Sequence, residues 1–288
     1  MFNMVISEKL KYRKDKQMFR ITSFADEISP DLSEQIRVMR SLGIKYVELR
    51  SVWDKGVLTL SDEERQKIKN LLDGNGISVS SVGSPIGKID IDCDFETYLE
   101  KFYRAIELAH FFGTKYIRIF SFYLGKKTLD ECRDKVLKRL ALMLGVAKRE
   151  GIVLCLENEA GIYGQKSARC KDILDSMNDA SFRAVIDPSN YVVAGEHPFE
   201  SLKKVHNYIE YVHIKDSISG GEIVPAGKGD GQIREILDFL RYHEDMFVTL
   251  EPHLAEAGSM RGFSGEELFV IAHRALVDIL DELGIKYV

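Results

Sequence analysis

Four apolar segments in the C-terminal half of the chain each stop at a side chain that can bind a metal ion. The segments are VLCLENE, FRAVIDPSN, YVHIKD and FVTLEPH, and the side chains are Glu157, Asp187, His213 and Glu251. They are 30, 26 and 38 residues apart, so each interval can hold a helix between two strands. Because the carboxyl ends of parallel strands meet at one rim of a barrel, the pattern predicts that these four side chains converge.

The whole chain repeats the order strand, loop, helix and glycine. Several apolar segments are nearly continuous, which is typical of parallel strands covered by helices. The regular repeat predicts an α/β fold, a (β/α)8 TIM barrel. The alternative is an open doubly wound sheet, but no G-x-G-x-x-G motif follows the first strand to indicate a dinucleotide site. The eight expected strands are 21–25, 46–50, 77–83, 116–122, 153–157, 182–187, 211–215 and 247–251.

Several helix starts are marked by capping residues. Ser29-Pro30 is expected to open the first helix, with proline in its first turn. The segment from Phe95 to Phe112 carries an aromatic and aliphatic stripe, which predicts a helix packed on the sheet. Capping boxes are expected at Ser61-x-x-Glu64, Thr128-x-x-Glu131 and Ser264-x-x-Glu267.

Composition narrows the classes of protein that the chain can belong to. It has 288 residues, is 45% hydrophobic and 30% charged, and carries a net charge of −5. This balance disfavours a nucleic-acid surface, which needs basic groups to neutralise phosphates. No stretch of 18 apolar residues predicts a membrane span, and the start has no apolar signal region. None of the four cysteines forms a C-x-x-C pair, so we expect a cytoplasmic protein with free thiols.

The first 18 residues are mostly polar and charged after residue 6. We therefore expect residues 1–18 to form a disordered N-terminal extension. No segment rich in proline, glycine or serine divides the remainder, so residues 19–288 are expected to form a single barrel domain.

Two glutamates, one aspartate and one histidine make an oxygen-rich set of ligands for a divalent cation. Mn²⁺ is the expected ion, and Mg²⁺, Co²⁺ and Zn²⁺ suit the same ligands. A single glutamate at a strand end is usually only a surface charge. Four ionisable groups at matching strand ends are hard to explain in that way.

The order and spacing of LENE, IDPSN, HIKD, AGKGDG and LEPH make residues 19–288 resemble the xylose-isomerase-like sugar phosphate isomerase/epimerase superfamily. The resemblance implies one divalent metal held by Glu157, Asp187, His213 and Glu251. It also implies that Glu157 and Glu251 are the catalytic acid/base groups on opposite faces of a carbohydrate substrate. A homodimer or homotetramer is a further expectation from the resemblance, together with the absence of nucleic-acid and membrane partners.

The expected reaction is isomerisation or epimerisation of a sugar or sugar phosphate. A carboxylate removes the proton next to a carbonyl, and a metal stabilises the resulting enediolate. The first alternative is a dehydratase or other lyase acting on a keto-sugar or inosose, because the same ligands permit loss of a β-hydroxyl. An apurinic endonuclease would need further histidine ligands, and Phe120-Ser121 stands where one is required. The remaining alternative is a non-catalytic sugar-binding barrel.

Other polar residues near the strand ends are candidates for substrate contacts. Lys215 shares the strand parity of His213, and Arg50 ends the second strand, so both are candidates to bind substrate oxygens. Asn190 either binds a hydroxyl group or shapes a turn, and ketose 3-epimerases of the superfamily have histidine there. Glu48 and Arg118 are expected to form a structural ion pair. The 227–231 loop, GKGDG, either approaches a phosphate through its N–H groups or forms a flexible turn.

Overall fold

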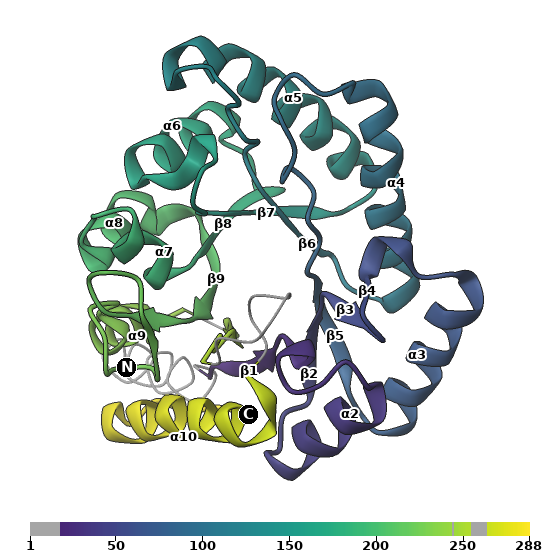
Figure 1. Ribbon diagram of the computed structural model, residues 1–288, viewed down its shortest axis with the longest axis vertical. Helices are drawn as coiled ribbons and strands as arrows, with labels where there is room; N and C mark the ends of the chain where they lie inside the picture. The colour runs from purple at the N-terminus through teal and green to yellow at the C-terminus, as the bar shows by residue number, and fades with distance from the viewer. Residues whose placement is uncertain (1–17, 244, 255–263) are drawn as a thin grey trace, which may run out of the picture.

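Eight parallel strands form a nearly closed barrel in the computed structural model, which describes residues 18–243, 245–254 and 264–288 (Figure 1). The hydrogen-bonded order is β1-β12-β9-β8-β7-β6-β5-β2, and β1 lies against β2 to complete the ring. The predicted TIM barrel is therefore confirmed, and the open doubly wound sheet is excluded. The strands are β1 (Arg20–Ser23), β2 (Tyr46–Leu49), β5 (Ser78–Val82), β6 (Tyr116–Ile119), β7 (Val153–Glu157), β8 (Phe182–Ile186), β9 (Ile209–Ile214) and β12 (Phe247–Leu250).

Helices surround the barrel (Figure 1). Buried apolar residues of both the strands and the helices form the core. The α-helices are α2 (Leu32–Ser41), α3 (Asp62–Gly74), α4 (Phe95–Phe112), α5 (Leu129–Arg149), α6 (Ser167–Met177), α7 (Pro188–Val193), α8 (Pro198–Val205), α9 (Ile233–Leu240) and α10 (Gly265–Leu283). Single 3₁₀ turns are η1 (Ala25–Glu27), η2 (Val57–Thr59), η3 (Tyr163–Gln165) and η4 (His206–Tyr208). Among the described residues, no helix has the length and apolar character needed to cross a membrane. The expected extension at 1–18 lies outside the described residues, except for its last residue.

Two of the predicted capping boxes are confirmed, at the starts of α3 and α5. The box at Ser264 is wrong, because this hydroxyl contacts Glu27 and the backbone N–H of Leu254 instead of capping α10. The expected start at Ser29-Pro30 is also displaced, since α2 begins after Asp31. The carboxylate of Asp31 accepts hydrogen bonds from two N–H groups of the first turn.

Loops after neighbouring strands are joined at the rim where the strands end. The expected strand 116–122 stops at Ile119, and Phe122 adopts a left-handed conformation with φ of 69°. The N–H of Phe122 donates to the carbonyl of Gly87, and its own carbonyl accepts from Tyr163. Two short hairpins also rise from the rim, β3 (Ser51–Val52) with β4 (Lys55–Gly56) and β10 (Asp216–Ser217) with β11 (Ile223–Val224).

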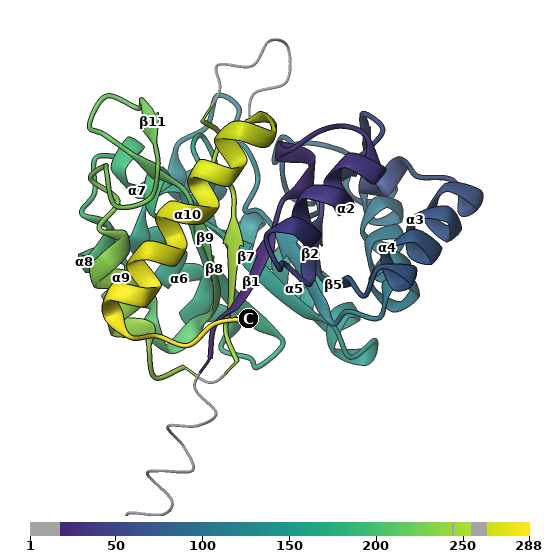
Figure 2. The same cartoon turned by 90° about the horizontal axis from the view of Figure 1, so that it is seen from below.

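The C-terminal end of the chain is hydrogen bonded to the backbone at β1. Helix α10 crosses the outside of the barrel (Figure 2), and the residues that follow it run alongside the first strand. Phe19 donates to the carbonyl of Lys286 over 2.9 Å, and the N–H of Val288 donates to Phe19 over 3.0 Å. These bonds hold the strand in place at the edge of the ring where it meets β2.

Candidate metal centre

The four predicted ligands lie at the ends of four neighbouring strands. Glu157 is the last residue of β7, Asp187 and Glu251 directly follow β8 and β12, and His213 is the fifth residue of β9. One potential ligand atom from each residue can be chosen so that all four lie within 4.8 Å of one another. All four side chains are buried. The topology therefore brings together residues that are up to 94 positions apart in the chain (157 to 251).

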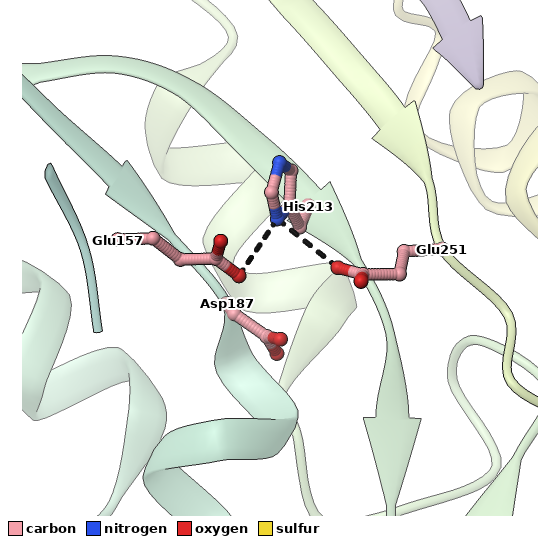
Figure 3. Close-up of side chains that lie close together, drawn as sticks. All are labelled: Glu157, Asp187, His213 and Glu251. Carbon is pink, nitrogen blue, oxygen red and sulfur yellow. Dashed lines mark hydrogen bonds and ion pairs between the residues drawn. The ribbon is translucent and has the colours of Figure 1, made fainter. Parts of the chain in front are cut away.

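The four side chains face a common centre (Figure 3). His213 Nδ1 is 3.0 Å from Glu157 Oε1 and 3.1 Å from Glu251 Oε2, and Asp187 completes the group. Each carboxylate has one buried oxygen without a hydrogen bond among the described residues, namely Glu157 Oε2, Asp187 Oδ2 and Glu251 Oε2. The charged neighbours of these atoms are cationic groups: Arg118 lies 3.3 Å from Glu157 Oε2, His213 Nδ1 lies 3.1 Å from Glu251 Oε2, and Lys215 pairs with Asp187 Oδ2. Three such oxygens and one imidazole nitrogen fit a divalent cation.

A cation accompanies each of the three carboxylates. Lys215 pairs with Asp187. Arg118 lies 3.3 Å from Glu157, and Arg50 lies 3.1 Å from Glu251. These contacts place Lys215 and Arg50, two candidate substrate residues, at the edge of the centre.

The expected Glu48–Arg118 ion pair is wrong. Arg118 turns towards Glu157 and the carbonyls of Gly83 and Ser84. Glu48 instead contacts His213 from inside the barrel. Strand parity correctly places both side chains inward, but it does not specify how deep each one lies.

The charges around the centre set different protonation states for the three carboxylates. Burial raises the pKa of Glu157, but His213 and Arg118 lower it more strongly, to about 2. Burial raises the pKa of Asp187 to about 6, although Lys215 opposes the rise. For Glu251, burial is outweighed by Lys215 and His213, and the pKa falls well below its usual value. Glu157 and Glu251 are therefore ionised at neutral pH.

Two aromatic rings lie between the cations, at the ends of β1 and β6, the strands on either side of the four that carry the ligands. The guanidinium carbons of Arg50 and Arg118 lie 4.3 and 4.8 Å from the ring centre of Phe24. Phe120 lies between Arg118 and Lys88 in the same way, at 5.0 and 4.4 Å. Such contacts fix the direction of each guanidinium group as well as stabilising its charge. The sequence analysis missed the two aromatic residues because an apolar side chain at a strand end looks like ordinary core.

Asn190 and its neighbour in space, Asn158, join the ends of β7 and β8. The amide of Asn158 accepts from the N–H of Asp187 and donates to the carbonyl of the same residue, both over 2.9 Å. Asn190 donates its side-chain amide to the carbonyl of Asn158 over 2.8 Å. These bonds favour the turn-shaping role of Asn190. Asn158, which stands in the LENE segment, was not singled out by sequence.

The glycine-rich loop closes around a protein carboxylate instead of presenting its N–H groups to a phosphate. Asp216 accepts hydrogen bonds from the N–H groups of Gly227, Gly229 and Gly231, at 2.8, 3.0 and 2.8 Å. A Cβ atom at Gly229 would lie 2.4 Å from Asp216 Oδ1, so the loop requires glycine to approach this closely. The phosphate-binding expectation for this loop is therefore wrong for these three donors.

His253 extends the charged cluster beyond Glu251. Its Nε2 lies 2.9 Å from Glu27 Oε1 and 3.3 Å from Glu251 Oε1. Burial lowers the pKa of His253, but Glu251 and Glu27 raise it more, to about 9. Glu27, from the turn after β1, was not found by sequence, because a glutamate near a strand end resembles a surface charge.

Known proteins resemble this chain along most of its length. A family model described as a xylose isomerase-like TIM barrel matches residues 36–270. An uncharacterized protein of Escherichia coli strain K12, YihM, is 23% identical over 189 residues, covering 62% of this chain and 56% of that protein. An inosose dehydratase of Clostridium perfringens is 30% identical over 93 residues, or 32% of this chain. The chain thus matches about half of the length of the first relative and 31% of the second.

Solved structures share the fold at low sequence identity. A D-tagatose 3-epimerase-like protein has a TM-score of 0.75 and 16% identity, with 92% of this chain and 98% of that chain covered. The probable 3-DHS dehydratase AsbF of Bacillus anthracis has a TM-score of 0.72 and 17% identity, with 90% of this chain and 98% of that chain covered. An IolI protein with a bound zinc atom has a TM-score of 0.75 and 18% identity, with 92% of this chain and 99% of that chain covered. From the family match, the chain belongs to the xylose isomerase-like TIM barrel family.

Proposed function

We propose that this chain is a divalent-metal-dependent isomerase or epimerase of a sugar or sugar phosphate, acting through an enediolate. The observation that carries the proposal is the arrangement of Glu157 and Glu251, which flank His213 from opposite sides while Asp187 completes the set (Figure 3). Two ionised carboxylates across one centre are what proton removal from one face and return to the other face require.

Glu157, Asp187, His213 and Glu251 would hold the metal, with Mn²⁺ as the proposed ion and Mg²⁺, Co²⁺ or Zn²⁺ as alternatives. A bound divalent cation supplies stabilisation of the negative charge that develops on the carbonyl oxygen. The ionised Glu157 or Glu251 would remove the proton next to the carbonyl and later release it to solvent, and the other carboxylate, after taking a proton from solvent, would return one to the substrate. Arg118 and Arg50 hold these two side chains in place. Inversion follows if the same carbon is reprotonated, and isomerisation if the neighbouring carbon is.

Lys215 and Arg50 are the proposed substrate-binding cations. The side chain of Arg50 is 22% exposed and that of Lys215 is 9% exposed, so both reach the border between the centre and solvent. Their N–H groups would donate to hydroxyl, carbonyl or phosphate oxygens of the carbohydrate.

A dehydratase is the second candidate, and Lys215 is the observation that favours it. Burial lowers the pKa of this ammonium group, but Asp187 and Glu251 raise it above its usual value, so it stays protonated beside the centre. A protonated donor at this position would assist departure of a β-hydroxyl group. The match with an inosose dehydratase agrees with this candidate.

Deuterium exchange tests the proposal. Chelated enzyme, with and without added Mn²⁺, is incubated in D₂O with a panel of ketoses, ketose phosphates and inososes, and products are followed by NMR. We expect metal-dependent deuterium incorporation at a carbon next to the carbonyl. An isomer of unchanged carbon skeleton and oxygen content supports the first candidate, and an unsaturated or dicarbonyl product that has lost water supports the second. Bound metal without either reaction across the panel would overturn both.

Substitution of one carboxylate supplies the matched test. Glu157→Gln is expected to abolish exchange and to weaken metal binding, because this side chain is proposed as both ligand and acid/base group. Glu150→Gln, at the exposed end of α5 and away from the four ligands, is the control and should leave both unchanged. Full exchange in the Glu157 variant would remove this residue from the mechanism.

A further inference from the structure

A buried carboxylate inside the barrel faces the side of His213 that points away from the metal centre. Glu48, on β2, is 0% exposed and lies 3.2 Å from His213 Nε2. The hydroxyl groups of Tyr211 and Thr249 each donate to the same carboxylate over 3.0 Å. Tyr211 and His213 are two residues apart on β9, and Thr249 is in register with His213 on β12. The four side chains therefore form one polar layer beneath the rim.

Glu48 lies at an irregularity in the pairing of β2 with β5. Val47 pairs with Val79 and Glu48 pairs with Ser81, so Ser80 is an extra residue on β5. Such an extra residue increases the local twist of the paired strands. Enclosing a carboxylate in the barrel interior is costly unless its oxygens are hydrogen bonded. The two hydroxyl donors and the imidazole satisfy that requirement, which explains how this charge is tolerated at zero exposure.

The imidazole of His213 is held in one orientation. Its Nδ1 faces Glu157 and Glu251, whereas the other ring nitrogen points away from these two carboxylates (Figure 3). The ring makes a T-shaped contact with Phe24 at a centroid distance of 5.1 Å and a tilted contact with Tyr211 at 5.6 Å. A neutral imidazole donates from one nitrogen and offers a lone pair on the other. A carboxylate at Nε2 can only accept, so it keeps a proton on Nε2, whereas at Nδ1, which faces two of the proposed ligands, a metal would take the place of a proton.

We propose that Glu48 is a positioning residue that accepts the Nε2 proton of His213 and thereby presents the Nδ1 lone pair to the metal. The inference rests on the metal centre of the proposed function and assigns a role to a residue outside the four ligands. The negative charge of Glu48 also makes the imidazole a stronger electron donor. Carboxylate partners of this kind typically change metal affinity by about 10- to 100-fold.

Metal affinity of an isosteric variant tests this role. Glu48→Gln keeps the size of the side chain but removes its charge and places an N–H₂ group among the donors. We expect Zn²⁺ and Co²⁺, titrated in competition with a chromophoric chelator, to bind about 10- to 100-fold more weakly to this variant. The control is Ser81→Ala, which alters the same buried layer one contact further away, at the Tyr211 hydroxyl. It should bind both ions like the unchanged protein, and circular dichroism checks the fold of each variant.

A measurement on the unchanged protein keeps the inference testable if the variant does not fold. Protein with ¹⁵N-labelled histidine is loaded with ¹¹³Cd²⁺. We expect cadmium coupling to Nδ1 of His213 and a proton on Nε2. Coupling to Nε2, or unchanged affinity in a folded Glu48→Gln variant, would overturn the role of Glu48 while leaving the metal centre in place. If the unchanged protein bound none of these ions, the proposed metal function itself would fail.

Discussion

Replacement of Asp216 by asparagine should destabilise the protein, although the two side chains are nearly the same size. Asp216 is 1% exposed, and its two oxygens accept three backbone N–H groups from the glycine-rich loop. Oδ2 accepts two of them and Oδ1 accepts the third. An asparagine has one acceptor oxygen, so whichever way its amide is turned, an NH₂ group faces at least one N–H. At least one hydrogen bond is lost and two donors are brought together.

The expected cost follows from this count. A hydrogen bond to a charged acceptor contributes about 1.5–3 kcal/mol, and a buried donor left without a partner costs a similar amount. We therefore expect Asp216→Asn to lower the free energy of unfolding by about 2 kcal/mol. For a chain of this size, that corresponds to a fall of roughly 3–4 °C in melting temperature.

Urea unfolding with excess chelator measures this cost without a contribution from bound metal. The matched control is Asp230→Asn in the same loop, where an exposed carboxylate accepts from Ser219, and the expected change is small. Amide exchange of Gly227 and Gly231 should accelerate in the Asp216 variant and not in the control. Equal stability of the two variants would refute the view that Asp216 holds the loop.

Three further predictions concern the rim, the centre and the thiols. Gly87→Ala should destabilise the fold by about 3 kcal/mol or more in urea unfolding, since φ is 93° and a Cβ would lie 2.0 Å from a backbone carbonyl oxygen. Gly74→Ala in α3, with nothing within 4 Å, should be neutral or stabilising. Metal affinity, measured by titration, should decrease as the pH is lowered from 7 to 5, because the pKa of Asp187 is raised to about 6 and the protonated acid binds metal poorly. At pH 8 a thiol reagent should label Cys93 but not Cys155, whose thiol is buried with a pKa well above its usual value; rapid labelling of Cys155 would contradict its placement.

The eight strands could be predicted because each one has a recognisable local pattern in the sequence. A strand that is covered on both sides is mostly apolar, and the residues after it must turn. The ends of the strands are harder to predict from the sequence. The apolar letters continue from Ile119 to Phe122, but the chain leaves the sheet there to bond with the loop after β5. That partner is distant in sequence, so composition alone could not place the boundary.

Helix starts show the same division between local and distant causes. Ser61 and Thr128 cap their helices because no other group competes for these hydroxyls, and the local motif decides. Ser264 has the same motif, but its hydroxyl reaches Glu27, which is 237 positions away. A buried carboxylate that needs a donor outweighs a single cap. Sequence patterns therefore predict caps well only where tertiary contacts leave the capping residue free.

In the metal centre, the four ligands could be predicted from the sequence but the residues that orient them could not, and the difference has a physical cause. The barrel topology alone brings Glu157, Asp187, His213 and Glu251 to one rim, so their positions at strand ends were enough to predict the group. The residues that orient them enter from other strands, and their partners depend on depth inside the barrel. Glu48 and Arg118 have the same strand parity, yet one meets the imidazole and the other meets Glu157. Side chains that differ in height by a residue or less cannot be distinguished by counting along a strand.

The pairing of charges around the centre also explains how Glu157 and Glu251 can both remain ionised in one buried site. Glu251 is anchored by Arg50 at Oε1, and Asp187 accepts the N–H of Asn190 at Oδ1. The second oxygen of Glu251 lies 3.1 Å from His213 Nδ1, and the second oxygen of Asp187 pairs with Lys215. Anchoring one oxygen fixes each carboxylate while leaving the other for a cation, which lowers the ordering cost of binding. The same protein cations also reduce the repulsion between the acids.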